Sequence, residues 1–458
     1  MKCIASFLAI ATMVMIICTS CNIAEIRPLK ARRTEVKQSE SQSTSFESKP
    51  QSKKIEISSV QSKSVDPPKK SVPIKEKYDK NGQYIANNFP EMKATWISYL
   101  ELQDILTKSS KSQFQKRLGA MLDNIRNMGL NTVILHARPY ADALYKSELY
   151  PTSSLLTEKA GSKMPFDPLS IAVSEAHKRG LSIHAWINPL RGQTTKELKL
   201  VDDKFVTKKW YNNRKKSDKI WEKEGRWYFN PAYPDVRKLI ADGAKEIVKK
   251  YDVDGLHFDD YFYPTTSKKF DKIAKNKFGR KMTLAQFRLS NCNKMVKETY
   301  QVIHKQSKTI KFGISPQGSI QNNYNSQYAD VKRWCKEGGY VDYISPQIYF
   351  GFKNTTSPFE QTVKQWKKIT TNKKVSISVG LAMYKVGMKS DQYAGKGKKE
   401  WNTGSADIIK RQIEYLKREN LNSFILYGYK AMFDLKSGKQ IGSKRMAEEM
   451  DNIIKLLV

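Results

Sequence analysis

The sequence predicts an α/β protein: one (β/α)8 TIM barrel preceded by a signal peptide and a disordered linker. Three observations support this prediction. Eight short β-rich segments recur from residue 89 onward, and stretches with helical periodicity separate them. Within these segments, apolar residues alternate with polar and aromatic ones, as in strands that face a helix layer on one side. Residues 1–88 lack both features and consist of an apolar start followed by a polar stretch.

Residues 1–20 have the composition of a secretory signal. Lys2 precedes an apolar run, Ile4–Ile17, that is too short for a comfortable membrane span. Two small residues stand directly before Cys21, as in the lipobox of bacterial lipoproteins, although Cys18 occupies the position of the usual Leu. We therefore expect lipidation of Cys21 and an exported protein, anchored to the bacterial cell membrane, that faces the cell wall or periplasm. An ordinary cleaved signal is the alternative.

Residues 21–88 predict a disordered tether. The segment is rich in Ser, Lys and Gln, carries Pro67-Pro68 and holds too few apolar residues to bury a core. Such a tether would let an anchored domain reach from the membrane into the cell wall. Once Cys21 is lipidated, only Cys292 and Cys335 remain in the mature chain. They could form one disulfide, but we expect two buried free thiols.

The chain is strongly basic. It has 81 Lys and Arg against 45 Asp and Glu, a formal net charge of +36, and the basic residues are spread along the sequence. Such a field favours anionic partners: lipid headgroups, acidic glycans and anionic cell-wall polymers such as teichoic acids. Nucleic acid is not an expected partner, because the chain reads as exported and has no recognisable nucleic-acid-binding motif. A solvated Lys-rich surface without a specific partner is the simpler alternative.

The elements of residues 89–458 alternate in the order that gives a parallel sheet, and eight repeats point to a closed barrel. The predicted strands are Ala94–Leu100, Thr132–Pro139, Ser182–Pro189, Gly255–Phe262, Lys311–Gly318, Tyr343–Phe350, Val375–Ala382 and Ser423–Tyr429. The predicted helices include Ser112–Met128, Pro168–Arg179, Pro234–Lys250, Ala406–Arg418 and a final helix near Ser443–Leu457. Insertions at Arg191–Asn230 and Tyr263–Leu284 follow the third and fourth strands, where they would form the rim of an active-site cleft.

Strand alternation assigns a face to each side chain. Apolar positions such as Leu256 and Phe258 belong to the helix side, so the intervening residues point into the barrel. The predicted inward residues are Trp96, Ser98, His136, Arg138, His184, Trp186, Asn188, His257, Asp259, Tyr261, Ser315, Gln317, Ser345, Gln347, Tyr349, Ser376 and Ser378. Buried polar groups must be paired or wet. Because so many lie near strand ends, we expect a ligand-binding cleft there; a structural hydrogen-bond network is the alternative.

Several of these segments carry recognisable motifs: ATWIS at 94–98, HAWINP at 184–189, WYFNP at 227–231, VDGLHFDDYFYP at 253–264, GISP at 313–316 and VDYISPQIY at 341–349. Together with residues 131–145, they resemble the bacterial glycosyl hydrolase-like 10 family. The resemblance implies a surface-anchored barrel glycosidase that cleaves extracellular polysaccharide, with bacterial cell-wall glycan of the peptidoglycan type as the favoured substrate. It implies no cofactor.

Asp259 and Asp260 are the predicted catalytic residues, because the family's motif on the fourth strand, as the resemblance implies, holds two adjacent carboxylates. Alternation favours Asp259, although a bulge could reverse the roles. The second carboxyl group that glycosidases normally use is not evident, and Glu101 and Asp142 lie after earlier strands. Catalysis assisted by a 2-acetamido group of the substrate would need only one enzyme acid. The predicted substrate-binding residues are Trp96, Arg138, Asp142, Trp186, Asn188, His257, Tyr261, Gln347 and Tyr349.

Two other functions fit the same pattern. His136, His184 and His257 lie in inward phase on neighbouring strands, and with Asp259 they could bind zinc in a metal-dependent polysaccharide deacetylase. We expect instead a layer of hydrogen-bonded histidines beneath the site, and no metal. A non-catalytic glycan-binding lipoprotein would keep the aromatic residues but would need no acid.

Overall fold

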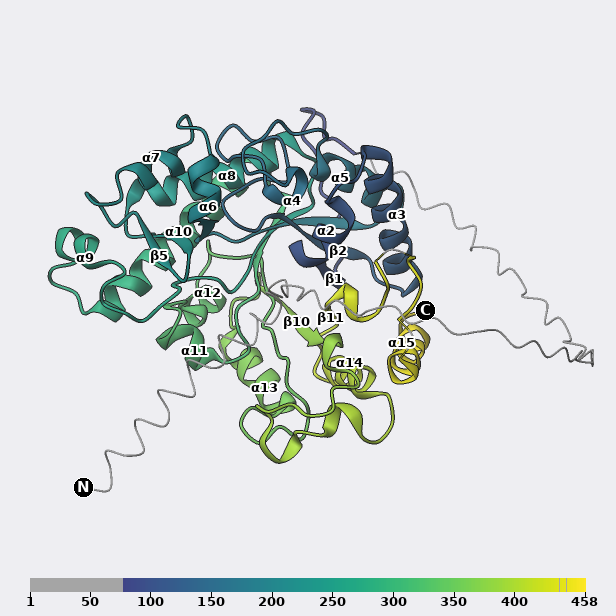
Figure 1. Cartoon of the computed structure of the whole chain (residues 1–458). Helices are drawn as coiled ribbons and strands as arrows, with labels where there is room; N and C mark the ends of the chain where they lie inside the picture. The colour runs from purple at the N-terminus through teal and green to yellow at the C-terminus, as the bar shows by residue number, and fades with distance from the viewer. Residues whose placement is uncertain (1–76, 436, 442) are drawn as a thin grey trace, which may run out of the picture. The chain divides into compact units, whose positions relative to one another are not determined.

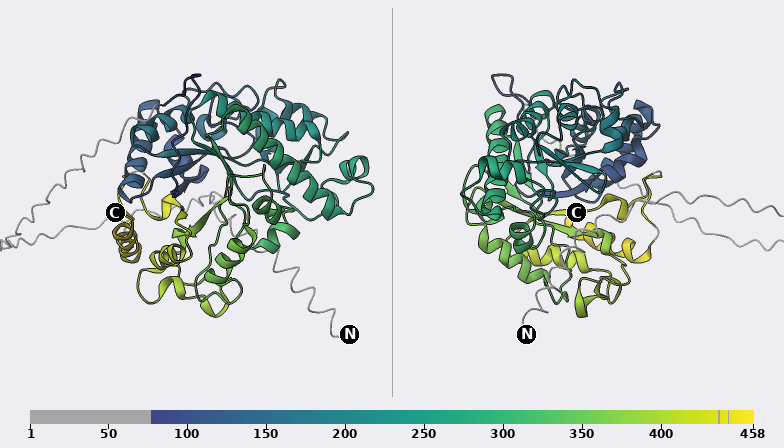
Figure 2. Two further views of the ribbon diagram at one scale, coloured as in Figure 1. Left: turned by 180° about the vertical axis from the view of Figure 1, so that it is seen from behind. Right: turned by 60° about the vertical axis from the view of Figure 1, so that its left-hand side comes forward.

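The computed structural model describes residues 77–435, 437–441 and 443–458. The expected signal peptide, Cys21 and the first part of the expected tether lie outside the described residues. Within them, eight parallel strands close into a barrel in the order β1-β2-β3-β7-β8-β9-β10-β11, with β11 paired to β1 (Figure 1). Helices surround the strands in each view (Figure 2). The predicted (β/α)8 barrel is therefore confirmed.

All eight barrel strands lie where the sequence predicts them, although most end earlier than expected. They are β1 (Lys93–Ile97), β2 (Thr132–Arg138), β3 (Ser182–Ile187), β7 (Gly255–Phe258), β8 (Lys311–Ile314), β9 (Tyr343–Ile344), β10 (Ser376–Ala382) and β11 (Ser423–Tyr427). The helices are α2 (Tyr99–Leu106), α3 (Lys111–Asn127), α4 (Ser154–Thr157), α5 (Pro168–Lys178), α6 (Thr195–Leu200), α7 (Val206–Asn212), α8 (Pro234–Lys250), α9 (Lys272–Phe278), α10 (Leu284–Gln306), α11 (Ile320–Asn325), α12 (Val331–Lys336), α13 (Phe359–Ile369), α14 (Ile408–Arg418) and α15 (Lys444–Leu457).

Strand alternation separates the outward side chains, which contact the helices, from the inward side chains, which fill the barrel. Apolar side chains of the outward phase, including Val133, Ile183 and Leu256, pack with the surrounding helices in one large cluster. A separate apolar cluster fills part of the interior and contains Trp96 and Trp186. The predicted assignment of faces is therefore confirmed for these strands.

The assignment is wrong for Arg138. The pairing of β2 with β3 shifts register between His136 and Arg138, so Arg138 pairs with Ile187, a residue of the outward phase. Its guanidinium lies 4.0 Å from the ring centroid of Tyr150, and it donates to the Tyr145 hydroxyl at 3.1 Å. Arg138 thus faces the helix layer rather than the interior, and its predicted role in substrate binding is corrected to a structural one.

The other part of the interior is a chain of hydrogen-bonded polar side chains, which we call the polar tier: Asn88, His184, Tyr343, His257 and Ser315. The amide nitrogen of Asn88 donates to two backbone carbonyls, so its oxygen accepts from His184 Nε2 at 3.1 Å. His184 Nδ1 must then accept from the Tyr343 hydroxyl at 2.7 Å, and that hydroxyl accepts from His257 Nδ1 at 2.9 Å. His257 Nε2 is left to accept from Ser315 at 2.8 Å.

Two glycines make room for the rings of the polar tier. A Cβ on Gly255 would lie 2.4 Å from the His184 ring, and a Cβ on Gly313 would lie 2.0 Å from the Tyr343 ring. Burial lowers the pKa values of His184, to about 4, and of His257, so both rings are neutral. The tier therefore holds one arrangement of protons without a buried charge.

Residues 77–88, which fall within the expected tether, contact the end of the barrel where the strands begin. The Tyr84 hydroxyl donates to Asp254 Oδ1 at 2.6 Å, and Asn88 joins the polar tier. Asp254 also accepts from the Ile183 amide at 2.8 Å. The segment before β1 thus belongs to the packing of the barrel from at least residue 84.

The insertion after β3 forms a small antiparallel sheet that the sequence did not predict. Its strands are β4 (Arg191–Thr194), β6 (Arg226–Phe229) and β5 (Ile220–Lys223), in that spatial order. Gly192 lies so close to the Trp227 carbonyl that a Cβ there would approach it to 2.6 Å. This close pairing fixes Arg191 beside the carboxyl ends of the barrel strands.

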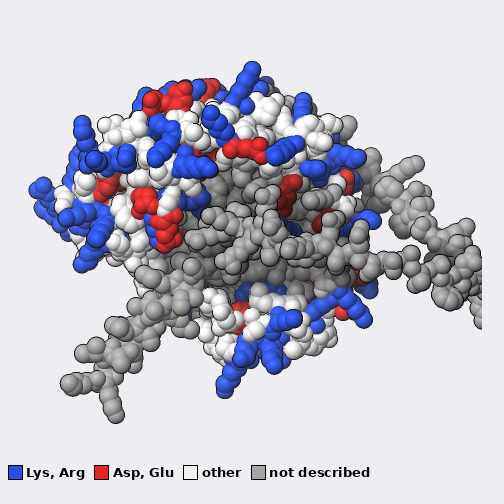
Figure 3. Space-filling view, viewed as in Figure 1, with Lys and Arg blue, Asp and Glu red and all other residues white. Residues whose placement is uncertain are grey.

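The distribution of surface charge and the state of the cysteines match what the sequence predicts. Lys and Arg side chains are spread over the face shown in Figure 3 rather than gathered in one patch. Cys292 and Cys335 are buried and free, as expected. Among the helices of the described residues, none has the length and apolar character needed to cross a membrane.

Tyr343→Phe tests the polar tier. Removal of the hydroxyl leaves Nδ1 of His184 and of His257 without a partner, so we expect the free energy of unfolding to fall by about 2–3 kcal/mol. Denaturant titration measures this change. Tyr324→Phe, at a position 42% exposed, is the matched control and should change stability by less than about 0.5 kcal/mol. Equal stability of the two variants would contradict the tier's structural role.

Candidate active site

The two adjacent carboxyl groups lie at the carboxyl end of the barrel, directly after β7. Because β7 ends at Phe258, strand alternation no longer applies to Asp259 and Asp260. Asp259 is 5% exposed, whereas Asp260 is partly exposed. The two carboxyl groups interact with each other, and the Asp260 amide also donates to Asp259 Oδ1 at 2.8 Å. The expected opposition of the two side chains is therefore not observed.

Gln347 connects this pair to the polar tier. Its amide nitrogen donates to Asp259 Oδ1 at 3.3 Å and to the Ser315 carbonyl at 2.9 Å. Ser315 in turn donates to His257. The chain of contacts fixes one oxygen of Asp259 from below and leaves Oδ2 for a proton.

Burial and like charge together hold a proton on the pair. Burial raises the pKa of Asp259 well above its usual range, the Asp260 carboxylate raises it further, and the Arg191 charge opposes the shift. Burial also raises the pKa of Asp260, but Asp259 and the amides of Gln317 and Gln327 lower it. The deeper burial of Asp259 and the like charge of Asp260 therefore favour a proton on Asp259 over one on Asp260. A carboxyl group that stays protonated at neutral pH can serve as a general acid.

The two other carboxyl groups considered as partners have contacts of their own. Glu101 accepts from the Ser98 amide at 2.9 Å and from the Lys430 amide at 3.4 Å, so it caps α2 and ties it to the chain after β11. Asp142 is fully buried, and burial raises its pKa to about 7. Its predicted role in substrate binding is not supported by this placement.

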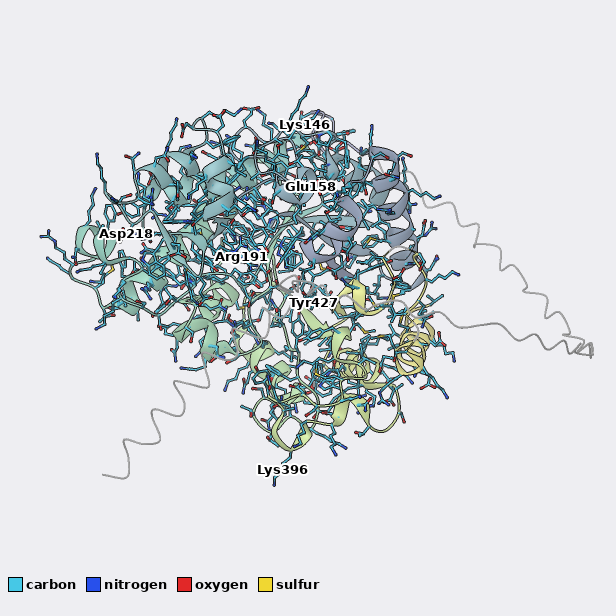
Figure 4. All side chains as sticks on the ribbon, in the orientation of Figure 1. Lys146, Glu158, Arg191, Asp218, Lys396 and Tyr427 are labelled. Atoms are coloured by element: carbon cyan, nitrogen blue, oxygen red, sulfur yellow. The ribbon has the colours of Figure 1, made fainter. Side chains whose placement is uncertain are left out.

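One arginine stands beside the carboxyl pair among aromatic rings. The Arg191 guanidinium lies 4.6 Å from the ring centroid of Tyr261, 4.8 Å from that of Tyr140 and 5.9 Å from that of Tyr99. Figure 4 shows Arg191 near the middle of the molecule, whereas Asp218 and Lys396 lie at its periphery. We call Arg191, Tyr99, Tyr140 and Tyr261 the arginine wall. Its tyrosines follow β1, β2 and β7.

A second aromatic group lies after β9 and β10 and at the end of β11. The rings of Tyr349 and Tyr427 stack with centroids 5.8 Å apart and planes at 9°, and Tyr384 meets both edge-on. Tyr384 is 41% exposed. Flat rings at the mouth of a barrel suit stacking on sugar rings.

The three interior histidines do not converge on a metal site. His184 and His257 use both ring nitrogens within the polar tier, and Trp96 also donates to His257 at 3.3 Å. His136 stacks on Trp186 with centroids 3.5 Å apart, and its Nδ1 accepts from a backbone amide. No group of three or more His, Cys, Asp or Glu among residues 77–458, where described, is arranged to hold a metal ion.

The structure gathers only some of the predicted site residues. Asp259, Asp260, Gln347 and Tyr261 lie together, and Tyr349 lies in the second aromatic group. Trp96, Trp186, Asn188 and His257 are buried beneath them and support the site; Asn188, for example, donates to the Pro139 carbonyl at 3.1 Å. The sequence analysis missed Tyr99, Tyr140, Arg191, Tyr384 and Tyr427. Position was the available signal, because each lies at or within four residues of a predicted strand end.

Comparison with known proteins adds a family. The profile of the family described as glycosyl hydrolase-like 10 matches residues 91–396. "Glycosyl hydrolase YngK" of Bacillus subtilis is 33% identical over 329 residues, which cover 66% of this chain and 62% of that protein. "Glycosyl hydrolase DigH" of Escherichia coli K12 is 29% identical over 356 residues, which cover 70% of this chain and 79% of that protein. This chain therefore spans less than two thirds of the B. subtilis relative.

Solved structures share the fold at low sequence identity. The catalytic domain of β-amylase from Paenibacillus polymyxa superposes with a TM-score of 0.50 at 10% identity, and covers 80% of this chain and 99% of that domain. An α-L-fucosidase isoenzyme from Paenibacillus thiaminolyticus also gives a TM-score of 0.50, at 11% identity, and covers 80% of this chain and 49% of that one. These similarities show a barrel and nothing finer.

Asp259→Asn tests the raised pKa through stability. A folded-state pKa above the unfolded value means that the fold binds an extra proton, so wild-type stability falls as pH rises from about 4 toward the raised pKa. Asn cannot ionise. We therefore expect the variant to exceed wild type by about 1–3 kcal/mol at pH 8 and by much less at pH 4. Thermal unfolding at both pH values measures the difference; a gap independent of pH would contradict the assignment.

Proposed function

This chain belongs to the glycosyl hydrolase-like 10 family, and from that premise we propose that it hydrolyses glycosidic bonds of an extracellular polysaccharide. The favoured substrate is bacterial cell-wall glycan of the peptidoglycan type. The observation that carries the proposal is the carboxyl pair Asp259 and Asp260 at the carboxyl end of the barrel, with its proton held on Asp259. Barrel enzymes place their catalytic groups at this end.

Asp259 is the proposed general acid. Its Oδ1 accepts from the Asp260 amide and from Gln347, so the proton on Oδ2 is free to pass to the oxygen of the scissile bond. Transfer of that proton lets the sugar leave as an alcohol rather than as an alkoxide. As the proton leaves, Asp259 becomes a carboxylate, and the nearby Arg191 charge favours that form.

Asp260 is the proposed stabilising carboxylate. Direct nucleophilic attack and inversion both require carboxyl groups about 5–9.5 Å apart on either side of the bond. Adjacent groups that share a hydrogen bond cannot flank a bond in this way. The arrangement therefore favours substrate assistance, in which a 2-acetamido group attacks the anomeric carbon and Asp260 stabilises the positive charge that develops on it.

The proposed place of action is the outer face of the cell membrane. The basis is the sequence alone: a signal that ends at Cys21 and a polar tether before the barrel. A basic protein of net charge +36 at this place would also attract anionic cell-wall polymers. Attachment and substrate would then lie in the same compartment.

Asp259→Asn tests the activity. The variant cannot donate a proton, so we expect the release of reducing ends from peptide-stripped peptidoglycan to fall at least about 100-fold, while the protein stays folded. Asp451→Asn, at an exposed position of α15, should retain wild-type activity. Undiminished release by Asp259→Asn would overturn the catalytic assignment, and glycan binding without any release by wild type would indicate a binding protein.

Cys21→Ser tests the anchor. Loss of the thiol removes the site of diacylation, so the variant should incorporate no labelled fatty acid and should leave the membrane fraction. Cys18→Ser is the matched control, because it changes the neighbouring thiol and keeps Cys21. Equal labelling of the two variants would contradict the proposed lipidation.

A further inference from the structure

We propose that Arg191, supported by Arg226, binds a carboxylate carried by the glycan, so that the enzyme is selective for acidic saccharides. The inference rests on the proposed glycosidase function and specifies its substrate. The arginine wall is then the part of the site that binds the anionic group.

Arg191 is buried without an anionic partner. It is 8% exposed, its Nε has no hydrogen-bond partner among the described residues, and no carboxylate of those residues forms an ion pair with it. Its neighbours are instead the rings of Tyr99, Tyr140 and Tyr261. Rings hold a guanidinium in place, but they leave its N–H groups unsatisfied. A buried charge of this kind is costly unless a ligand completes its bonding.

Two other buried arginines, Arg288 and Arg237, are paired with carboxylates. Arg288 pairs with Asp271 through two hydrogen bonds, at 2.8 and 2.7 Å, and also donates to two backbone carbonyls. Arg237 donates to Glu298 at 3.0 Å and to the Pro231 carbonyl at 2.9 Å. Arg191 departs from both. Arg138 also lacks an acid and packs on the Tyr150 ring, but it faces the helix layer, whereas Arg191 interacts with Asp259 and packs on the Tyr261 ring at the carboxyl end of the barrel.

Arg226 places a second positive charge at the same position. Its guanidinium lies 3.9 Å from the Tyr140 ring centroid, and it donates to the Gly192 carbonyl at 2.9 Å. Strands β4 and β6, which carry the two arginines, pair with each other in the inserted sheet. Two guanidinium groups therefore flank one ring. Neighbouring like charges repel each other. The buried Asp142 carboxyl interacts with Arg226, and a bound anion would add a negative group beside Arg191.

Arg191 and the proposed acid are connected through Tyr261 and through electrostatic interaction. The charge of Arg191 lowers the pKa of Asp259, so the guanidinium lies within electrostatic range of the proposed acid. Tyr261, two residues after Asp259, carries the ring nearest to Arg191. A sugar positioned for cleavage would thus present its substituents to the arginine wall.

The planar fork of a guanidinium matches a carboxylate through two parallel hydrogen bonds. Among saccharides, a carboxylate occurs either on the ring, as in a uronic acid, or on an ether side chain, as in the lactyl group of peptidoglycan glycan. Both present the same chemistry to Arg191. Two matched pairs of substrates distinguish them: peptide-stripped glycan strands and a polyuronate, each before and after reduction of its carboxyl groups to alcohols.

We expect wild-type kcat/KM to be about 10- to 100-fold higher on one acidic polymer than on its reduced form, as for one charge-assisted pair. Preference for stripped strands identifies the ether-linked carboxylate, and preference for the polyuronate identifies the ring carboxylate. Arg191→Gln should bring the ratio of kcat/KM on the acidic polymer to kcat/KM on its reduced form close to one, whatever loss the two polymers share. Arg191→Lys keeps the positive charge but not the planar guanidinium, so its preference for the acidic polymer should lie between those of wild type and Arg191→Gln. Arg333→Gln, at an exposed position, is the control and should match wild type.

Each contrary result has a separate meaning. Equal cleavage of acidic and reduced polymers by wild type would overturn the inference and leave the glycosidase proposal intact. If Arg191→Gln loses kcat/KM by the same factor on the acidic and the reduced polymer, Arg191 is a positioning residue, and the inference is overturned as well. If wild type cleaves none of the polymers, the proposed function itself fails. Thermal unfolding of both Arg191 variants shows whether a loss of activity comes from misfolding. If Arg191→Gln does not fold, the ratio of activities of Arg191→Lys on the acidic and reduced polymers tests the inference.

Discussion

The interior of a closed barrel has to be filled, and here it is filled in large part by polar groups that satisfy one another. The polar tier runs from Asn88 through His184, Tyr343 and His257 to Ser315. Each hydroxyl and ring nitrogen in it has one consistent donor or acceptor role, so the tier is rigid without carrying charge. Gln347 donates both to the Ser315 carbonyl and to Asp259, so it connects the position of Asp259 to the tier. The position of the proposed acid therefore depends on packing deep in the barrel.

The site above the tier contains groups that a purely structural barrel would avoid. A buried carboxyl pair and a buried arginine without an anionic partner both reduce stability. The two costs are related, because Arg191 lies close enough to Asp259 to oppose its protonation but does not neutralise it. This balance keeps an acid protonated beside a positive charge that remains available for a ligand. The rings of the arginine wall and of the second aromatic group would stack on sugars.

The sequence predicted the barrel, the number and positions of its strands and the family, because repeated β-then-α periodicity is a global signal that tolerates local errors. Alternation also placed Trp96, Trp186 and the tier histidines correctly. It failed at Arg138, where a register shift of β2 reversed the phase, and at Asp260, because β7 ends before it. It did not assign Arg191, because this residue lies past the end of β3, in an inserted sheet that barrel-strand alternation does not describe. Irregular backbone and the inserted sheet thus account for the part of the site that was missed.

The central claim is that Asp259 keeps its proton at neutral pH while Asp260 is ionised. Infrared difference spectra of wild type minus Asp259→Asn, recorded from pH 4 to pH 9, measure it directly, because a protonated carboxyl group and a carboxylate absorb at different frequencies. The account predicts that the band lost in the variant is that of a protonated carboxyl group at pH 7, and that Asp260→Asn shifts its titration to lower pH by removing the neighbouring charge. A carboxylate band at pH 5 and above would contradict the account.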